Sequence, residues 1–401
     1  MAKIESSEPV ARKEKKTLLT GSLAHFIQDG FSDMLYVFFP LWQAQFALSF
    51  AEIGFLKTLF SGTMAGFQVP ASSLAQRVGS LRLLTAGIVL TSVTVFCWGY
   101  AATPLALGVF LVLGGLGASV QHPIASSLIS NAYVGVSARR TALSTFNVAG
   151  DIGKLALPGT AAYLLLNHSW MSVGQMFGLL GAGIALVIIL SQRNVRQSEG
   201  AMQAKAGKAS GGRLRWRGYE AFWSLSTIGV IDSATRMGFL TFLPFLLQEK
   251  GAGIATIGLV LSLIFAGGAA GKLVCGILAL KVGVLRSVIV TELMTTLGIF
   301  AMILFPLQAA IVFSPFIGIA LNGTSSVLYG SVPELVTEER RQQAFAVFYT
   351  LTIGSGAVSP FLYGMLSDSV GVKTAVIIVA LVALLTLPLT APLRNKISGK
   401  R

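Results

Sequence analysis

Charged residues are scarce in this chain of 401 residues. Asp, Glu, Lys and Arg make up 11% of it and apolar residues 54%, whereas a soluble domain carries roughly 25% charged residues. So few charges cannot cover a surface that faces water, which excludes an ordinary soluble protein. The composition predicts an all-α polytopic membrane protein, and the length suits about twelve helices of ~20 residues with short connections.

Sequence features that support metal, cofactor or catalytic chemistry are also missing. The chain has two Cys and three His, and none of them shows the spacing of a metal site or a disulfide framework. It contains no G-x-S-x-G nucleophile elbow and no complete phosphate-binding loop. We therefore expect no metal, no cofactor and no enzyme activity, and any work must be driven by the gradient of an ion or of a substrate.

The surplus of basic residues follows the predicted topology. The net charge is +14, and with the N-terminus in the cytoplasm that side holds 24 of the 30 Lys and Arg residues. This bias is what the positive-inside rule requires of an inner-membrane protein with both termini in the cytoplasm. No basic patch with interleaved aromatics appears, so we expect a lipid bilayer but no nucleic acid as partner. The predicted spans are 18–43, 53–76, 81–102, 105–131, 141–166, 172–192, 218–247, 254–280, 285–306, 308–331, 342–366 and 372–392.

The chain repeats itself at a spacing of 204 residues. AEIGFLKTLFSGTMAG from Ala51 aligns with ATIGLVLSLIFAGGAA from Ala255, and SSLAQRVGSLR from Ser72 aligns with GILALKVGVLR from Gly276. Two homologous halves in one membrane chain can rock against each other around a site near the bilayer midplane. The repeat therefore predicts a secondary transporter that works by alternating access, and twelve helices suffice for the monomer that we expect.

One segment without apolar periodicity separates the two halves. Residues 193–217 are rich in Gly, Ser, Ala, Lys and Arg and are predicted to be a cytoplasmic linker. The predicted organisation is a cytoplasmic tail (1–17), a six-helix bundle (18–192), the linker, a second six-helix bundle (218–393) and a second tail (394–401). Glycines four residues apart should let helices approach closely within the bundles, and these are Gly62 and Gly66, Gly174 and Gly178, and Gly267 and Gly271.

Two basic loops resemble the signature G-x-L-A-D-R-x-G-R-K of the major facilitator superfamily. They are SSLAQRVGSLR and GILALKVGVLR, in which Gln76 and Leu280 stand where the signature has Asp. The missing Asp calls into question the carboxylate-based latch that this loop usually provides. The resemblance covers nearly the whole chain and implies a central cavity gated by these loops, through Arg77, Gly79, Arg82, Lys281, Gly283 and Arg286.

Shorter segments are similar to the fosmidomycin-resistance efflux branch of that superfamily. They are HFIQD at 25–29, QHP at 121–123, FNVAGDIGKLALP at 146–158, PEL at 333–335 and GMLSD at 364–368. The chain departs from the branch at Ile124, where a Glu is favoured, and at Asp151 and Lys154, which add charges. The resemblance implies export of a small compound or drug, acting as an antiporter, and these departures leave the substrate range open.

Ionisable residues inside apolar spans are functional candidates, since each costs at least ~2.5–3.5 kcal/mol in a bilayer. His25, Asp29 and Asp33 fall on one face of the first span, at i, i+4 and i+8. Asp29 is predicted to carry a proton or contact substrate, or else to form a structural pair with His25. Asp33 is either a substrate contact or a partner of Lys57.

Further acid–base pairs lie in later spans. Asp151 and Lys154 either neutralise each other or form a switchable pair that opens when Asp151 is protonated or an anion claims Lys154. Asp232 and Arg236 repeat the arrangement, and Arg236 is predicted to bind an anion through two parallel hydrogen bonds. Lys272 and Glu292 are expected to pair structurally.

The sequence therefore favours proton-coupled efflux of a small, anionic organic compound. The candidates for proton coupling are Asp29, Asp151, Asp232 and His122. An unperturbed imidazole has a pKa of about 6.5, which suits a proton relay, but His122 can also be a packing group. The candidates for substrate binding are Arg236, Lys154, Asp33, His25, and Asn147 and Asn322, which can instead bridge helices. Proton-coupled uptake of an organic anion is the alternative, since one sequence does not set the direction of transport. A non-transporting scaffold is a third interpretation, and the charges near the bilayer midplane argue against it.

Overall fold

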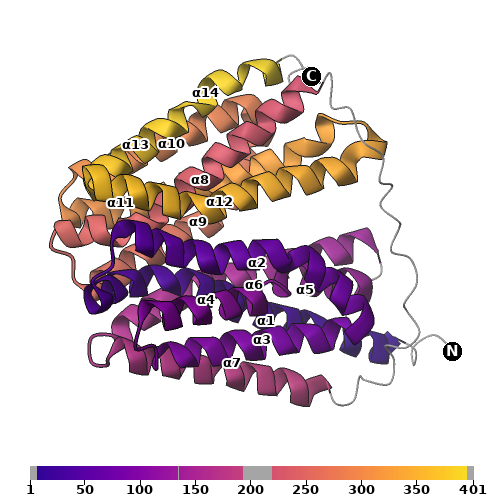
Figure 1. Ribbon diagram of the computed structural model, residues 1–401. Helices are drawn as coiled ribbons and strands as arrows, with labels where there is room; N and C mark the ends of the chain where they lie inside the picture. Colours follow the sequence, from indigo (N-terminus) through magenta and orange to yellow (C-terminus); the bar gives the residue numbers. More distant parts are fainter. Residues whose placement is uncertain (1–6, 134, 193–218, 395–401) are drawn as a thin grey trace. The chain divides into compact units, whose positions relative to one another are not determined.

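The computed structural model describes residues 7–133, 135–192 and 219–394, and every regular element in this part of the chain is a helix (Figure 1). The first half contains α1 (Ser7–Phe46), α2 (Phe50–Val78), α3 (Ser80–Trp98), α4 (Pro104–Ala118), α5 (Gln121–Ala132), α6 (Val136–Leu164) and α7 (Trp170–Gln192). The second half contains α8 (Glu220–Glu249), α9 (Ile254–Val282), α10 (Val284–Leu304), α11 (Leu307–Ser331), α12 (Arg341–Val370), α13 (Val372–Leu384) and α14 (Thr386–Leu389). Three short 3-10 turns complete it: η2 (Val332–Glu334), η3 (Glu338–Arg340) and η4 (Ala391–Leu393).

These helices confirm the predicted all-α membrane fold. Nine of the described helices are long and apolar enough to cross a membrane, and α1, α2 and α6 are not among them. The predicted span 105–131 is divided between α4 and α5 just before Pro123, which has no N–H to donate to the preceding turn. The predicted linker 193–217, the first six residues of the chain and residues 395–401 lie outside the described residues, and α1 begins at Ser7, within the predicted tail.

The chain forms two compact units whose boundary falls inside α1, α2 and α6. Unit 1 comprises Met1–Asp33, Gly66–Leu157 and His168–Leu214, and unit 2 comprises Met34–Ala65, Pro158–Asn167 and Arg215–Arg401. In unit 1, α3 packs against α7 and α4. In unit 2, α9 packs against α11, α8 against α12, and α10 against α11 and α13.

Small residues allow some of these helices to touch through their backbones. The prediction is confirmed for α9, where β-carbons at Gly267 and Gly271 would strike the backbone of α11, and for the pair in α7, which lies against α3. It is wrong for α2, because a β-carbon at Gly62 or Gly66 would meet no described atom within 4 Å. Spacing alone does not distinguish the face of a helix that meets a neighbour from the face that does not.

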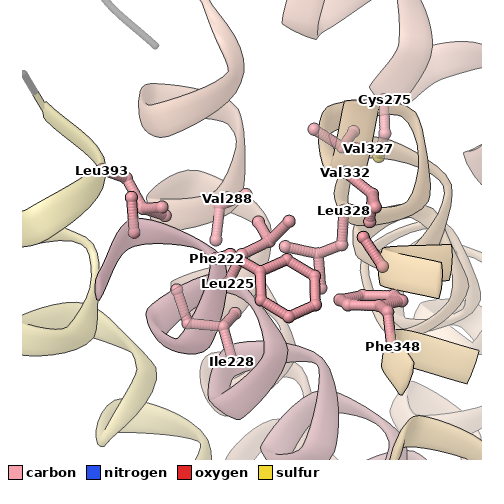
Figure 2. Packing of buried hydrophobic residues seen from close by; sticks show 12 residues of the cluster. Phe222, Leu225, Ile228, Cys275, Val288, Val327, Leu328, Val332, Phe348 and Leu393 are labelled. Carbon is pink, nitrogen blue, oxygen red and sulfur yellow. The ribbon is translucent and has the colours of Figure 1, made fainter. Parts of the chain in front are cut away.

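Unit 2 has a core of buried apolar side chains near the start of α8 (Figure 2). Figure 2 shows Phe222, Leu225 and Ile228 of α8 gathered with Leu328 of α11 and Phe348 of α12. All five are at most 1% exposed. Since lipid tails are as apolar as these side chains, the cluster stabilises the unit by close packing more than by leaving water.

Candidate functional site

Three polar side chains lie on one buried face of α1, within unit 1. His25, Asp29 and Asp33 have only 5%, 7% and 8% of their surface exposed. Intervals of four residues place them above one another on the helix. A carboxylate buried to this degree requires a charged or hydrogen-bonding partner, and helices α5 and α6 supply it.

Asp29 is the centre of the cluster. Its Oδ2 lies 3.0 Å from His25 Nε2 and 3.2 Å from Lys154 Nζ of α6, and its Oδ1 lies 3.3 Å from His122 Nε2 of α5. Lys154 Nζ also lies 4.0 Å from Asp33 Oδ2. The side chains of His122 and Lys154 keep 41% and 34% exposure, while that of Asp29 keeps 9%. A ligand from solvent can therefore reach His122 and Lys154 more easily than Asp29 itself.

The contacts of His25 offer a place for a proton beside Asp29. His25 Nδ1 lies 2.9 Å from the carbonyl oxygen of Phe146, and because a carbonyl only accepts, Nδ1 carries the proton of this bond. In a neutral imidazole Nε2 is then an acceptor, yet it faces a carboxylate oxygen at 3.0 Å. Two acceptors do not attract each other, so this contact becomes a hydrogen bond only when a second proton lies on Nε2 or on Oδ2. The His25–Asp29 pair therefore offers a place for one proton more than a neutral imidazole and a carboxylate hold together.

Glycines of α6 make room for this arrangement. A β-carbon at Gly150 would lie 2.5–2.7 Å from three atoms of the His25 ring, and one at Gly153 would strike the backbone of Phe26. The His25 ring also packs on Phe146, with centroids 4.2 Å apart. The local sequence of α6 thus brings α1 and α6 together and fixes the orientation of the imidazole.

The same atoms form a candidate metal site in the described part of the chain. His25, Asp29 and His122 each offer a ligand atom within 4.8 Å of the others, a set that zinc and other transition metals accept. However, the Lys154 ammonium 3.2 Å from Asp29 already supplies positive charge there and would repel a divalent ion. The cluster is better suited to binding a proton or an anion than to binding a metal.

A second polar site lies in unit 2 along α8. Asp232 and Arg236 line a small cavity of about 10 Å³, roughly the space of one water molecule, together with polar side chains of α8, α11 and α12, namely Ser233, Ser325, Tyr329 and Thr352. Arg236 Nε has no hydrogen-bond partner among the described residues, and Asp232 lies close enough for Arg236 to attract it. A guanidinium with an unused donor among hydroxyl groups fits a carboxylate, phosphate or phosphonate.

The other predicted binding residues lie apart from these two clusters or at their edge. Asn147 is exposed on α6. Asn322 of α11 donates to Gly318 O at 3.4 Å and lies against Gly268 of α9, which favours a role between helices. Asp151 is half-buried and lies close enough to Lys154 to attract its ammonium.

The two predicted gating loops share one backbone conformation. Gly79 and Gly283 are each the single residue between two helices, and their φ angles are 101° and 86°, a region that favours glycine. The four basic side chains of these loops are exposed: Arg77, Arg82, Lys281 and Arg286. They are therefore free of the buried clusters, as residues of a surface loop are.

Two buried polar residues, both glutamines, were missed by the sequence reasoning. Gln28 donates to Thr91 Oγ1 at 3.1 Å, but its Oε1 and both amide atoms of Gln121 have no hydrogen-bond partner in the described part of the chain. Glu292 is 1% exposed and its Oε1 also has no partner there, so pairing with Lys272 would leave this oxygen unsatisfied. The signal for the glutamines was their position beside Asp29 and His122 in the segments HFIQD and QHP.

A helical membrane chain with two repeated halves and buried charges within reach of solvent defines a membrane transporter. The family model of the Major Facilitator Superfamily matches residues 21–231 and 225–399. The chain therefore belongs to the major facilitator superfamily and is a transporter, not an enzyme.

Known proteins resemble the chain at low identity. It is 25% identical over 201 residues to the fosmidomycin resistance protein of Escherichia coli K12, and the aligned stretch covers 48% of each chain. It is 25% identical over 158 residues to the multidrug transporter mfsC of Aspergillus fumigatus, and the aligned stretch covers 39% of this chain and 30% of the relative. The chain thus spans about a third to a half of the length of these curated relatives.

Solved structures share the fold over nearly the whole chain. A bacterial homologue of the human lysosomal transporter Spinster, in an inward-facing and occupied conformation, matches with a TM-score of 0.79 and 17% identity, covering 95% of this chain and 97% of that one. A point mutant of the nucleoside transporter NupG matches with a TM-score of 0.73 and 12% identity, covering 94% and 99%. At these identities the likeness concerns the fold alone.

Proposed function

We propose that this protein exports a small organic compound across the inner membrane in exchange for protons, by alternating access. The likeness to a fosmidomycin resistance protein and a multidrug transporter supports export. The distribution of Lys and Arg supports a topology with both termini and the two gating loops, after α2 and α9, in the cytoplasm. In this proposal the two predicted bundles (18–192 and 218–393) rock against each other, and one chain is sufficient.

The observation that carries the proposal is the contact of Asp29 with His25 and Lys154, which offers a place for a proton. Asp29 is the proton carrier, with His25 as the partner that shares the proton and His122 as the half-exposed relay to solvent. Lys154 and Arg236 are the anchors for a negatively charged group of the substrate. Asp151 and Asp232 are the reserve candidates for proton coupling, since each lies beside one of these two cations.

Proton-coupled uptake of an organic anion is the second candidate, and the contact between Lys154 and Asp29 favours it. An anion that takes Lys154 from Asp29 leaves this carboxylate without its nearest ammonium, and the carboxylate then binds a proton more strongly. Proton and anion would therefore bind together and travel in the same direction. Exchange instead requires that the substrate and the proton compete.

The sign of a pH change separates the two candidates. Proteoliposomes containing a pH dye are mixed with each of a panel of small organic anions, without an imposed gradient. Exchange predicts that the interior becomes alkaline as substrate enters, and co-transport predicts that it becomes acidic. Asp29→Asn should abolish the change in either case, while Glu220→Gln, the same chemical change at an exposed site, should leave it intact.

The results assign the coupling residue as well. A pH change that survives in Asp29→Asn would move the proton role to His122, Asp151 or Asp232. No pH change with any compound, in protein shown to be folded by its thermal transition, would contradict proton coupling and favour the scaffold.

A further inference from the structure

The start of α2 is held by a carboxylate that belongs to α12. Asp368 Oδ1 lies 2.8 Å from the backbone nitrogen of Phe50, and Oδ2 lies 2.9 Å from that of Ala51. The contact lies inside unit 2, which contains both segments. Asp368 ends the segment GMLSD and has no part in the two polar sites described above.

The four N–H groups at the start of α2 show why this carboxylate fits. Ser49 and Glu52 form a capping box, in which Ser49 Oγ accepts from Glu52 N at 3.2 Å and Glu52 Oε2 accepts from Ser49 N at 2.8 Å. Ile53 N donates to Ser49 O at 3.1 Å. Only the N–H groups of Phe50 and Ala51 then remain without a partner in their own helix. Asp368 accepts from both.

Asp368 also occupies a repeated position in the chain. Residues 74–79, 278–283 and 366–371 read LAQRVG, LALKVG and LSDSVG. In all three the final Gly has a positive φ angle (101°, 86° and 81°) and is followed directly by the next helix. Asp368 stands where the first two copies have Gln76 and Leu280. The carboxylate that is missing in the last turn of α2 is therefore present at the N-terminal end of α2, supplied by α12.

The two helices approach closely around this contact. A β-carbon at Gly54 would strike the backbone of Pro360, and one at Gly364 would strike the backbone of Phe50. Phe55 and Phe361 meet edge-on with centroids 5.7 Å apart. The backbones can touch in this way only because glycine stands at both crossing points.

We infer that Asp368 is a positioning residue that holds α2 on α12 when this end of the transporter is closed, and that it releases α2 when this end opens. The inference rests on the proposed alternating access. Release of α2 costs little free energy because Asp368 is exposed, so water can replace its carboxylate on the two N–H groups. The capping box keeps the start of α2 helical after release. The carboxylate thus stabilises one conformation without being needed for the fold.

Distances between spin labels test the inference directly. Labels at Gln45 and Lys373, both exposed near this contact, are introduced after replacement of the native Cys97 and Cys275. They are measured by double electron–electron resonance without substrate or gradient. Asp368→Asn should increase the ratio of long to short distances by about tenfold, which corresponds to ~1.4 kcal/mol. Its turnover in transport should change more than its KM.

Two variants separate the latch from ordinary helix capping. Ser49→Ala removes a cap that is present in both conformations, so it should lower the melting temperature without changing the distance ratio. Glu249→Gln, at an exposed carboxylate that ends α8, should change neither. Unchanged distances in folded Asp368→Asn, or an equal shift in Ser49→Ala, would overturn the inference. The distance measurement needs no substrate, so its outcome is independent of the transport assay. The inference about Asp368 can therefore be overturned while proton-coupled transport is observed, and it can be supported where no such transport is found.

Discussion

Replacing Gly150 with alanine should disable the proton-holding pair while leaving the fold intact. The new β-carbon would lie 2.5 Å from His25 Nε2 and 2.6 and 2.7 Å from two ring carbons, so the imidazole must move. The ring is held by Phe146 O on one side and Asp29 on the other. Any movement that relieves the clash therefore lengthens at least one of these two contacts.

The cost to stability should be small compared with the cost to transport. An extra methyl group in a packed interior costs about 1–3 kcal/mol, but Ala is favoured over Gly within a helix by about 0.8–1.0 kcal/mol. The net destabilisation is then about 0–2 kcal/mol. Loss of the geometry that holds the proton should reduce substrate-evoked proton flux at least about tenfold, since a misplacement near 1 Å at a functional site can cost far more.

The assay compares proton flux and thermal stability in two controls. Gly183→Ala makes the same change in α7, where a β-carbon would meet no described atom within 4 Å, and should keep full flux with equal or higher stability. The double variant Gly150→Ala/His25→Ala removes the clash, so stability should recover while flux does not. Flux in Gly150→Ala equal to that in Gly183→Ala would refute the role of His25 orientation.

Three further predictions concern other contacts. Lys154→Met should destabilise the protein by about 1–3 kcal/mol. Breaking a fully buried ion pair costs about 3–5 kcal/mol, and the cost should be smaller here because the ammonium is partly exposed. Adding Asp29→Asn should restore much of the lost stability in a melting experiment. Gly267→Ala should destabilise by about 1–3 kcal/mol against the backbone of α11, whereas Gly276→Ala on the same helix, with nothing within 4 Å, should not. Lys250 donates to two carbonyls at the end of α10, and its pKa is lowered by desolvation and then by the neighbouring Lys373. Between the lowered and the ordinary pKa, the unfolded chain binds more protons than the folded chain, so the stability should rise with pH across that window. This rise should be absent in Lys250→Gln.

The helices could be predicted from the sequence because each apolar run reports directly on the environment of its own residues. Every predicted span is matched by helix, including 105–131, which Pro123 divides into α4 and α5. The spacing of His25, Asp29 and Asp33 likewise predicts one face of α1, since the helix period is local information. Predictions of this kind need no knowledge of which helices are neighbours.

Pairings between helices could not be predicted in the same way. The sequence favours partners within one helix, such as Asp151 for Lys154, yet the close contacts of Lys154 are with Asp29 and Asp33 of α1. The glycines at 62 and 66 have the spacing of a helix contact without the contact. The cap on α2 joins residues 317 and 318 positions apart in the chain, a separation at which spacing carries no information.

Lys154 connects the chemistry of the proton to the charge of the substrate. With Asp29 ionised, the ammonium lies 3.2 Å from this carboxylate and 4.0 Å from Asp33. A proton on Asp29 removes the closer partner and leaves the ammonium available to an anion. By reciprocity, an anion on Lys154 must increase proton binding at Asp29 by the same factor. A substrate that exchanges for protons must therefore compete at Asp29 or His25 itself, whereas a substrate held by Lys154 alone moves with the proton. The direction of the pH change thus reports which of these residues the substrate contacts, before the substrate has been seen in the site.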